Sequence, residues 1–218
     1  MLRPPSPLVA IADADLLGGD PVGPAVRAAA AGVRWVCLRA RAASTAERIA
    51  WAGAIREASP GVFITVHADP EACRAVGAPG LHLPGCGFDV ARVRRELPGV
   101  LLGVSCHDRG ELEAARRAGA DYAFLSPVFP PASKLGTPLG LERFRELATG
   151  AGIPVIGLGG ITPDRVGPVL AAGAAGVAVL GALFLAPDLG ARVAEFRDAL
   201  ERAGRPLGPA REHEEVET

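Results

Sequence analysis

The stretch that decides the fold is AAGAAGVAVLGALF, residues 171–184, where a helical pattern meets a glycine, a short turn and an apolar run. The same order of features occurs in AVGAPGLHL, residues 75–83, and in RAGADYAFL, residues 117–125. Such recurrence marks a repeated helix–strand unit of roughly 25 residues. The chain is therefore predicted to alternate β-strands with α-helices.

Eight short apolar runs are candidate β-strands. Their apolar residues are continuous and do not alternate with polar ones, which is typical of parallel strands covered on both faces. Patterns typical of helices fill the intervals between them. The candidate strands are residues 8–13, 35–40, 62–68, 80–84, 101–106, 122–128, 154–160 and 176–184.

This series of units predicts an α/β fold with a single (β/α)8 TIM barrel over residues 1–204. An open doubly wound sheet is the alternative, but it needs a reversal of strand order of which the sequence shows no sign. The polar stretch of residues 205–218 is predicted to be a disordered tail.

Local patterns indicate where several helices begin and end. Ser44 followed by Glu47 is typical of a capping box. Thr162 is a candidate cap, with Pro163 at the first helical position. Gly119 is expected to end the helix of residues 108–119.

Composition excludes several classes of protein. The 218 residues are 49% hydrophobic, enough for a sizeable core, and carry a net charge of −1 without a long basic run, so nucleic-acid binding is not expected. No segment approaches the roughly 18 apolar residues of a membrane span, and the N-terminal apolar run is too short for a signal peptide. The four cysteines form no CxxC pair and are interpreted as reduced thiols of a cytoplasmic protein. The oligomeric state is left open, and a homo-oligomer is allowed.

Functional residues of such a barrel gather at the carboxyl ends of its strands. GLGGIT, residues 157–162, ends the seventh strand, and Leu180 and Gly181 lie in the eighth. Gly159 and Gly160 let backbone amides approach phosphate oxygens, and a helix N-terminus favours the anion. These four residues are predicted to bind phosphate, and the alternative is that the glycine pair only makes a tight turn.

Two arginines and a histidine follow the second and third strands. Arg39 and Arg41 are spaced i and i+2, which points both to one face of a strand, and they are predicted to bind an anion. Solvated rim arginines are the alternative. His67 is a candidate proton carrier because its usual pKa lies near neutrality. His82 is interpreted as a structural histidine with satisfied hydrogen bonds.

Lys134 is the only lysine among the 23 basic residues. It lies in LSPVFPPASKLGTPLG, residues 125–140, a segment rich in Pro and Gly. Its ammonium is a compact point charge on a flexible stem, which suits a phosphate where the planar fork of arginine would impose a bidentate geometry. Lys134 is predicted to contact a phosphate, and a solvated loop lysine is the alternative.

A set of motifs occurs in order along the chain: AVGAPGLHL, GVSCH, ADYAFLSPVFPPASK, PLGLERF, IPVIGLGGIT and AAGAAGVAVLGALF. Together they resemble the thiamine phosphate synthase/TenI superfamily over most of residues 8–184. The resemblance implies the same barrel. Synthases of this superfamily join a pyrimidine-methyl pyrophosphate to a thiazole phosphate with Mg²⁺ and release pyrophosphate. TenI-type relatives include enzymes that tautomerise a thiazole phosphate.

The resemblance also implies roles for individual residues. Ser133 and Lys134 correspond to a Thr-Lys pair that holds pyrophosphate oxygens, and Arg41 stands where a lysine is usual. The positions that match the superfamily's phosphate and pyrophosphate residues are Arg39, Ser105, Ser133, Lys134, Gly159 and Gly160.

The Mg²⁺ positions depart from the superfamily pattern. His67 and Ala68 replace an Asn-Asp pair, and Gly87 stands where a second metal-binding aspartate is expected. Asp69 and Asp89 lie close by, so a shifted metal site stays open. Pyrophosphate is a poor leaving group unless its charge is neutralised, so the loss of both aspartates is expected to impair synthase chemistry.

Three hypotheses follow. The favoured one is a TenI-like enzyme that transfers protons on a phosphorylated heterocycle such as a thiazole phosphate without a metal cofactor, with His67 and Lys134 as catalytic residues. His67 enters because the histidine of a TenI-type tautomerase is replaced here by Pro127. The alternatives are a thiamine phosphate synthase with relocated Mg²⁺ ligands and a non-catalytic sensor of thiamine or thiazole phosphate.

Overall fold

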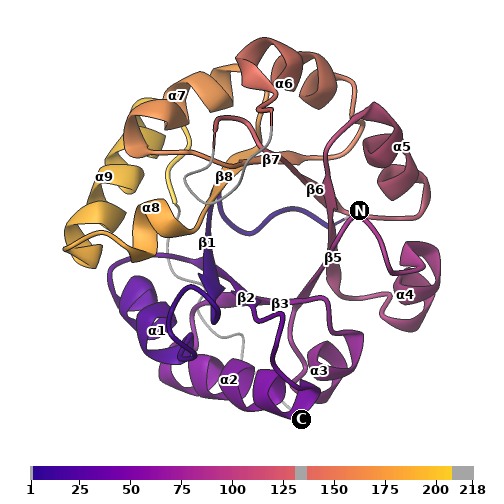
Figure 1. The fold of residues 1–218 in the computed structure, drawn as a ribbon, viewed down its shortest axis with the longest axis vertical. Coiled ribbons are helices and arrows are strands. Elements are labelled where there is room, and N and C mark those ends of the chain that lie inside the picture. The colour runs from indigo at the N-terminus through magenta and orange to yellow at the C-terminus, as the bar shows by residue number, and fades with distance from the viewer. Residues whose placement is uncertain (1, 131–136, 208–218) are drawn as a thin grey trace, which may run out of the picture.

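The computed structural model describes residues 2–130 and 137–207. Within these ranges eight parallel strands follow one another in chain order around a closed barrel, and helices surround it (Figure 1). The predicted (β/α)8 TIM barrel is confirmed. The strands are β1 (Leu8–Asp13), β2 (Trp35–Arg39), β3 (Phe63–His67), β4 (Gly80–Leu83), β5 (Leu101–Cys106), β6 (Tyr122–Leu125), β7 (Val155–Leu158) and β8 (Gly176–Val179).

A helix follows each strand on the outside of the barrel, and β8 is followed by two (Figure 1). This alternation covers the outer face of the sheet, which explains the continuous apolar strands. The helices are α1 (Val22–Ala30), α2 (Thr45–Ala58), α3 (Pro70–Ala75), α4 (Val90–Glu96), α5 (Arg109–Arg117), α6 (Gly140–Thr149), α7 (Pro163–Ala171), α8 (Gly181–Phe184) and α9 (Leu189–Arg202).

The hydrophobic core has two parts, one on each face of the closed sheet. The larger part lies between the strands and the helices and includes Leu38, Phe144 and Phe196. The smaller part fills the barrel interior with residues such as Ile11, Trp35 and Tyr122. The barrel is thus packed solid, and ligands are restricted to its ends.

Three strands end well before the residues that the sequence predicted, and the second, third and fourth strands stop within one residue of them. The eighth stops at Val179, and residues 181–184 form α8 instead of continuing the strand. The seventh stops at Leu158 because Gly159 and Gly160 take positive φ angles of 103° and 61°. The sixth stops at Leu125, two residues before Pro127, which has no N–H to donate to a neighbouring strand.

The predicted helix ends are largely confirmed. Ser44 and Glu47 form the capping box of α2, and Gly119 follows α5 with a φ of 89°. Thr162 occupies the N-cap position of α7 but its side chain caps no backbone amide. It hydrogen-bonds the carboxylate of Asp164 instead.

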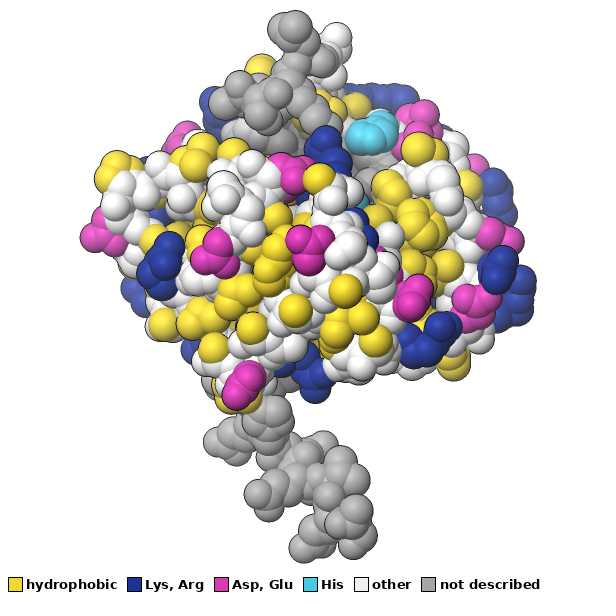
Figure 2. All heavy atoms as spheres, turned by 60° about the horizontal axis from the view of Figure 1, so that its bottom comes forward, with side chains coloured by type: hydrophobic (Ala, Val, Ile, Leu, Met, Phe, Trp, Pro, Cys, Tyr) yellow, Lys and Arg dark blue, Asp and Glu magenta, His cyan; other side chains and the backbone are white. Residues whose placement is uncertain are grey.

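The predictions about the tail, membrane spans, thiols and surface charge can be compared with the described residues. Residues 208–218 of the predicted tail lie outside the described residues, so its disorder stays a prediction. None of the helices within residues 2–130 and 137–207 is long and apolar enough to cross a membrane. The thiols of Cys37, Cys73, Cys86 and Cys106 are free. On the face that Figure 2 shows, acidic and basic side chains are interspersed.

Gly103→Ala tests how tightly the interior is packed. An added Cβ would lie 2.1 Å from a ring carbon of the buried Tyr122, so the free energy of unfolding is expected to fall by roughly 1–3 kcal/mol. Gly53→Ala is the control, because nothing lies within 4 Å of its added Cβ. Because Gly53 lies in the middle of α2, its replacement by alanine should raise the free energy of unfolding by roughly 0.5–1 kcal/mol. Denaturant unfolding measures both, and a neutral Gly103→Ala would contradict the packing.

Candidate active site at the carboxyl ends of the strands

Most of the predicted site residues lie at one end of the barrel. Because all strands run parallel, their carboxyl ends meet there. This arrangement brings together residues that lie far apart in the sequence, and Ser133 and Lys134 lie outside the described residues. The described ones, at or just after strand ends, are Arg39, Arg41, His67, Ser105, Gly159, Gly160, Leu180 and Gly181.

Arg39 forms an ion pair with a buried carboxylate. It ends β2 directly opposite Asp13, which ends β1, and the two side chains form an ion pair in which Asp13 is only 5% exposed. A buried carboxylate needs such a partner. Arg39 therefore reaches a substrate anion only while it also holds Asp13.

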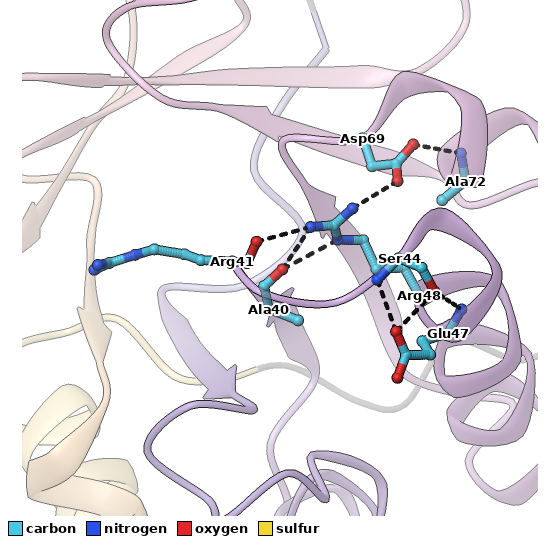
Figure 3. A network of polar contacts seen from close by, with 7 residues as sticks. All are labelled: Ala40, Arg41, Ser44, Glu47, Arg48, Asp69 and Ala72. Carbon is cyan, nitrogen blue, oxygen red and sulfur yellow. Dashed lines mark hydrogen bonds and ion pairs between the residues drawn. The ribbon is translucent and has the colours of Figure 1, made fainter.

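Arg41 is placed differently from Arg39, although the sequence put both on one face. The strand ends at Arg39, so strand alternation does not extend to Arg41. Arg41 is exposed, and Figure 3 shows its side chain pointing away from the neighbouring polar network. Within the described part of the chain it forms no ion pair, so its positive charge is available to an anion.

Arg48, for which no local sequence pattern predicts a role, holds the segment that carries Arg41 (Figure 3). From the first turns of α2 its guanidinium donates to the carbonyl of Ala40 at 2.6 and 3.2 Å and to that of Arg41 at 3.4 Å. A fourth contact, at 3.0 Å, reaches the carboxylate of Asp69. An arginine on a helix is ordinarily solvated, so only the fold reveals this role.

Asp69 and Asp89, the two candidate metal ligands, both cap helices. Asp69 accepts from the amide of Ala72 at 2.8 Å, and Asp89 accepts from that of Arg92 at 2.9 Å. Burial alone would raise the pKa of Asp69, but hydrogen bonds from Ala72, Thr45 and Arg48 lower it overall.

The residues present do not fit a Mg²⁺ site held by carboxylates. Asp69, the nearer candidate, faces the guanidinium of Arg48. In the described ranges no group of three His, Cys, Asp or Glu side chains is placed to hold a metal. Mg²⁺ favours one or two carboxylates with free oxygens, whereas both oxygens of Asp69 are engaged, one by the amide of Ala72 and the other by Arg48.

His67 is a weak base in this setting. Its pKa is lowered to about 4, first by burial and then by the positive charges of Arg41 and Arg48. Its ring stacks on that of His82, with the ring centres 5.8 Å apart. At neutral pH it is therefore uncharged, and its conjugate acid is scarce.

Ser105 is hydrogen-bonded to a side chain of the barrel interior. Its Oγ lies 2.9 Å from His82 Nε2, while His82 Nδ1 lies 3.1 Å from Tyr122 Oη. Both nitrogens of the buried His82 have partners, which confirms it as a structural histidine. Ser105 itself is half-buried at the mouth.

Gly159 and Gly160 let two chain segments approach closely. A Cβ on Gly159 would lie 2.8 Å from Pro127, and one on Gly160 would lie 2.7 Å from the carbonyl of Pro130. The carbonyl of Gly159 accepts from the amide of Phe129 at 3.1 Å. The tight turn is thus observed. Among the described residues no acceptor is recorded for the amides of the two glycines, so the turn is compatible with phosphate binding.

Arg48→Met tests the network of Figure 3. It leaves the carboxylate of Asp69 without its ionic partner, so the free energy of unfolding is expected to fall by roughly 3 kcal/mol. Arg92→Met is the control, because its pair with Glu96 is exposed and should contribute less than about 1 kcal/mol. Denaturant unfolding compares the two, and equal losses would show that Arg48 is merely a surface residue.

His67 is expected to titrate near pH 4 in an NMR titration of the folded protein. Its pKa in the unfolded chain is near the usual 6.5, so the folded state favours the neutral ring. The contribution of His67 to the free energy of unfolding is therefore complete above pH 6.5 and is lost as the pH falls toward 4. His67→Gln should flatten this part of the stability–pH profile, and titration of His67 near 6.5 would contradict the assigned burial.

Comparisons with known proteins agree with the resemblance seen in the sequence. The model of the thiamine monophosphate synthase family matches residues 8–183. A thiamine-phosphate synthase of Moorella thermoacetica is 35% identical over 192 residues, which cover 85% of this chain and 91% of that protein. The thiamine biosynthesis bifunctional protein ThiM/ThiE of Symbiobacterium thermophilum is 40% identical over 178 residues, or 79% of this chain. The match spans only 37% of that longer protein.

A solved structure shares the whole barrel. The thiamine phosphate pyrophosphorylase from Pyrococcus furiosus superposes with a TM-score of 0.83 at 26% identity, over 91% of this chain and 97% of that one. Family match, sequence identity and fold agree over nearly the same residues. The chain therefore belongs to the thiamine monophosphate synthase family of thiamine-biosynthesis enzymes.

Proposed function

We propose that this chain is a thiamine-phosphate synthase, which joins a pyrimidine-methyl pyrophosphate to a thiazole phosphate and releases pyrophosphate. The observation that carries the proposal is the 35% identity to the Moorella thermoacetica protein, named thiamine-phosphate synthase, over 91% of that protein's length. The sequence alone favoured a metal-free TenI-like tautomerase, and the comparisons support the synthase alternative better.

Two features of the mouth disfavour the tautomerase. Pro127, which has no ionisable side chain, stands where a TenI-type tautomerase carries its histidine, and its backbone packs against Gly159. His67, the proposed substitute, has a pKa of about 4 and holds a proton poorly at neutral pH. A synthase needs no proton carrier at either position to break the bond between the pyrimidine methylene and pyrophosphate.

The proposed roles divide the mouth between the two substrates. The amides of Gly159 and Gly160, with the segment at Leu180 and Gly181, would hold the phosphate of the thiazole. The positive charges of Arg41 and Lys134, with the hydroxyls of Ser105 and Ser133, would hold the pyrophosphate, and Arg39 would support them from its pair with Asp13. When the bond between carbon and oxygen breaks, negative charge grows on the pyrophosphate, and these groups stabilise it.

Mg²⁺ supplies neutralisation of pyrophosphate charge in this family. Asp69 is engaged by Arg48, and no group of three metal-ligating side chains is placed to hold an ion in residues 2–130 and 137–207, so the proposed steps rest on the protein's own cations. We further propose that the enzyme acts in the cytoplasm, which the four free thiols support.

Arg41→Gln tests the proposed pyrophosphate site. Loss of a charged hydrogen bond should raise the KM for the pyrimidine pyrophosphate roughly tenfold, with little effect on the KM for the thiazole phosphate. Arg95→Gln, an exposed arginine on α4, is the control and should leave both values unchanged. Steady-state coupling assays measure them across a Mg²⁺ titration.

Two results would overturn the proposal. Tautomerisation of a carboxythiazole phosphate without coupling would restore the TenI-like hypothesis. A thermal shift with thiazole or thiamine phosphate, with turnover of neither substrate set, would identify a sensor.

A further inference from the structure

A line of polar side chains crosses the barrel interior and ends at its mouth. The indole N–H of Trp35 donates to Thr65 Oγ1 at 2.6 Å, and the Thr65 hydroxyl hydrogen-bonds the phenol of Tyr122. Tyr122 Oη lies 3.1 Å from His82 Nδ1, and His82 Nε2 lies 2.9 Å from Ser105 Oγ. The first four residues are fully buried, and Ser105 alone is partly exposed.

Two glycines make room for this line. Gly80 pairs with Thr65, and Gly103 pairs with both His82 and Tyr122 in the parallel register. A Cβ would lie 2.8 Å from Thr65 Oγ1 at the first position and 2.1 Å from the Tyr122 ring at the second. Stacking on Phe124, with ring centres 4.0 Å apart, fixes the plane of the His82 ring.

The direction of the hydrogen bonds follows from counting donors and acceptors. Indole N–H is a donor only, so Thr65 accepts from Trp35 and its own hydrogen is left for Tyr122. Tyr122 then accepts from Thr65 and donates its hydrogen to His82 Nδ1. Burial lowers the pKa of His82 well below its usual value, and His67 adds to the effect. The ring is therefore neutral and carries its single proton on Nε2, which donates to Ser105.

The opposite direction leaves a buried hydrogen without an acceptor. If His82 carried its proton on Nδ1, Tyr122 would accept from His82 and would have to donate to Thr65. The hydrogen of Thr65 would then have no recorded acceptor among the described residues. Buried donors without partners are costly and rare, so the first direction is the stable one.

We propose that Tyr122 and His82 are positioning residues that fix Ser105 as a hydrogen-bond donor at the mouth of the barrel. Because Ser105 Oγ accepts from His82, its own hydrogen is free to point toward a bound acceptor. The identity of that acceptor rests on the proposed function: it is an oxygen of a phosphate or pyrophosphate group. The polarity of the line itself does not depend on any ligand.

The tautomer of His82 tests the polarity directly. In ¹⁵N-labelled protein without ligand, NMR should show His82 protonated at Nε2, with Nδ1 accepting a hydrogen bond. Tyr122→Phe should move the Nδ1 resonance toward that of a nitrogen without a donor. Thr65→Ser, which keeps the hydroxyl, should leave both resonances unchanged. Protonation at Nδ1 in the wild-type protein would overturn the proposal, whether or not the protein turns over either substrate.

A double-mutant cycle separates positioning from general structural support. If Tyr122 acts through Ser105, Tyr122→Phe should raise the KM for the pyrophosphate substrate roughly threefold in the wild-type background. It should have almost no effect in a Ser105→Ala background. An equal rise in both backgrounds would overturn the positioning role. Should no turnover be found with either substrate, the proposed function fails while the tautomer measurement still decides the polarity.

Discussion

The backbone pairing of β8 with β1 closes the barrel, and the rest of the molecule depends on that closure. Leu8 and Ala10 pair with Val177 and Val179, and the amide of Val177 donates to the carbonyl of Pro7 at 2.8 Å. A closed sheet has no exposed edge, and its parallel strands place every carboxyl end on one rim. Side chains contributed by separate segments of the chain therefore face one another without long loops to carry them.

Closure also determines how charge is distributed around the mouth. Two arginines, Arg39 and Arg48, are held by the carboxylates Asp13 and Asp69. The first pair links the ends of β1 and β2, and the second links α2 to the N-cap of α3. The positive charges of both arginines are therefore largely neutralised within the protein. Arg41 lies on the segment that Arg48 holds, so the guanidinium proposed to bind the substrate is positioned by an arginine that is itself paired within the protein. The ion pair between Arg48 and Asp69 also occupies the carboxylate that a metal ion would need.

Much of the architecture was predictable because it is written in local patterns. The eight strands, the Ser44 capping box and Gly119 all follow from residues within a few positions of one another. Strand ends were predicted less well: α8 was taken for strand because an apolar run such as that of residues 176–184 fits either structure. The functional prediction shows the same limit. The missing metal-binding aspartates favoured a tautomerase. The identity over most of the chain to a protein named thiamine-phosphate synthase supports the synthase proposal instead.

The sequence by itself determined the alternation of strands and helices, the class of fold and the residues that stand at strand ends, because each depends on short-range periodicity and turn chemistry. Only the tertiary structure decided which of those residues are free. The partners of Arg39, Asp69 and Ser105 come from elements 26, 21 and 23 residues away, and no local pattern records such pairings. The line from Trp35 to Ser105 likewise exists only because five different strands meet inside one closed barrel.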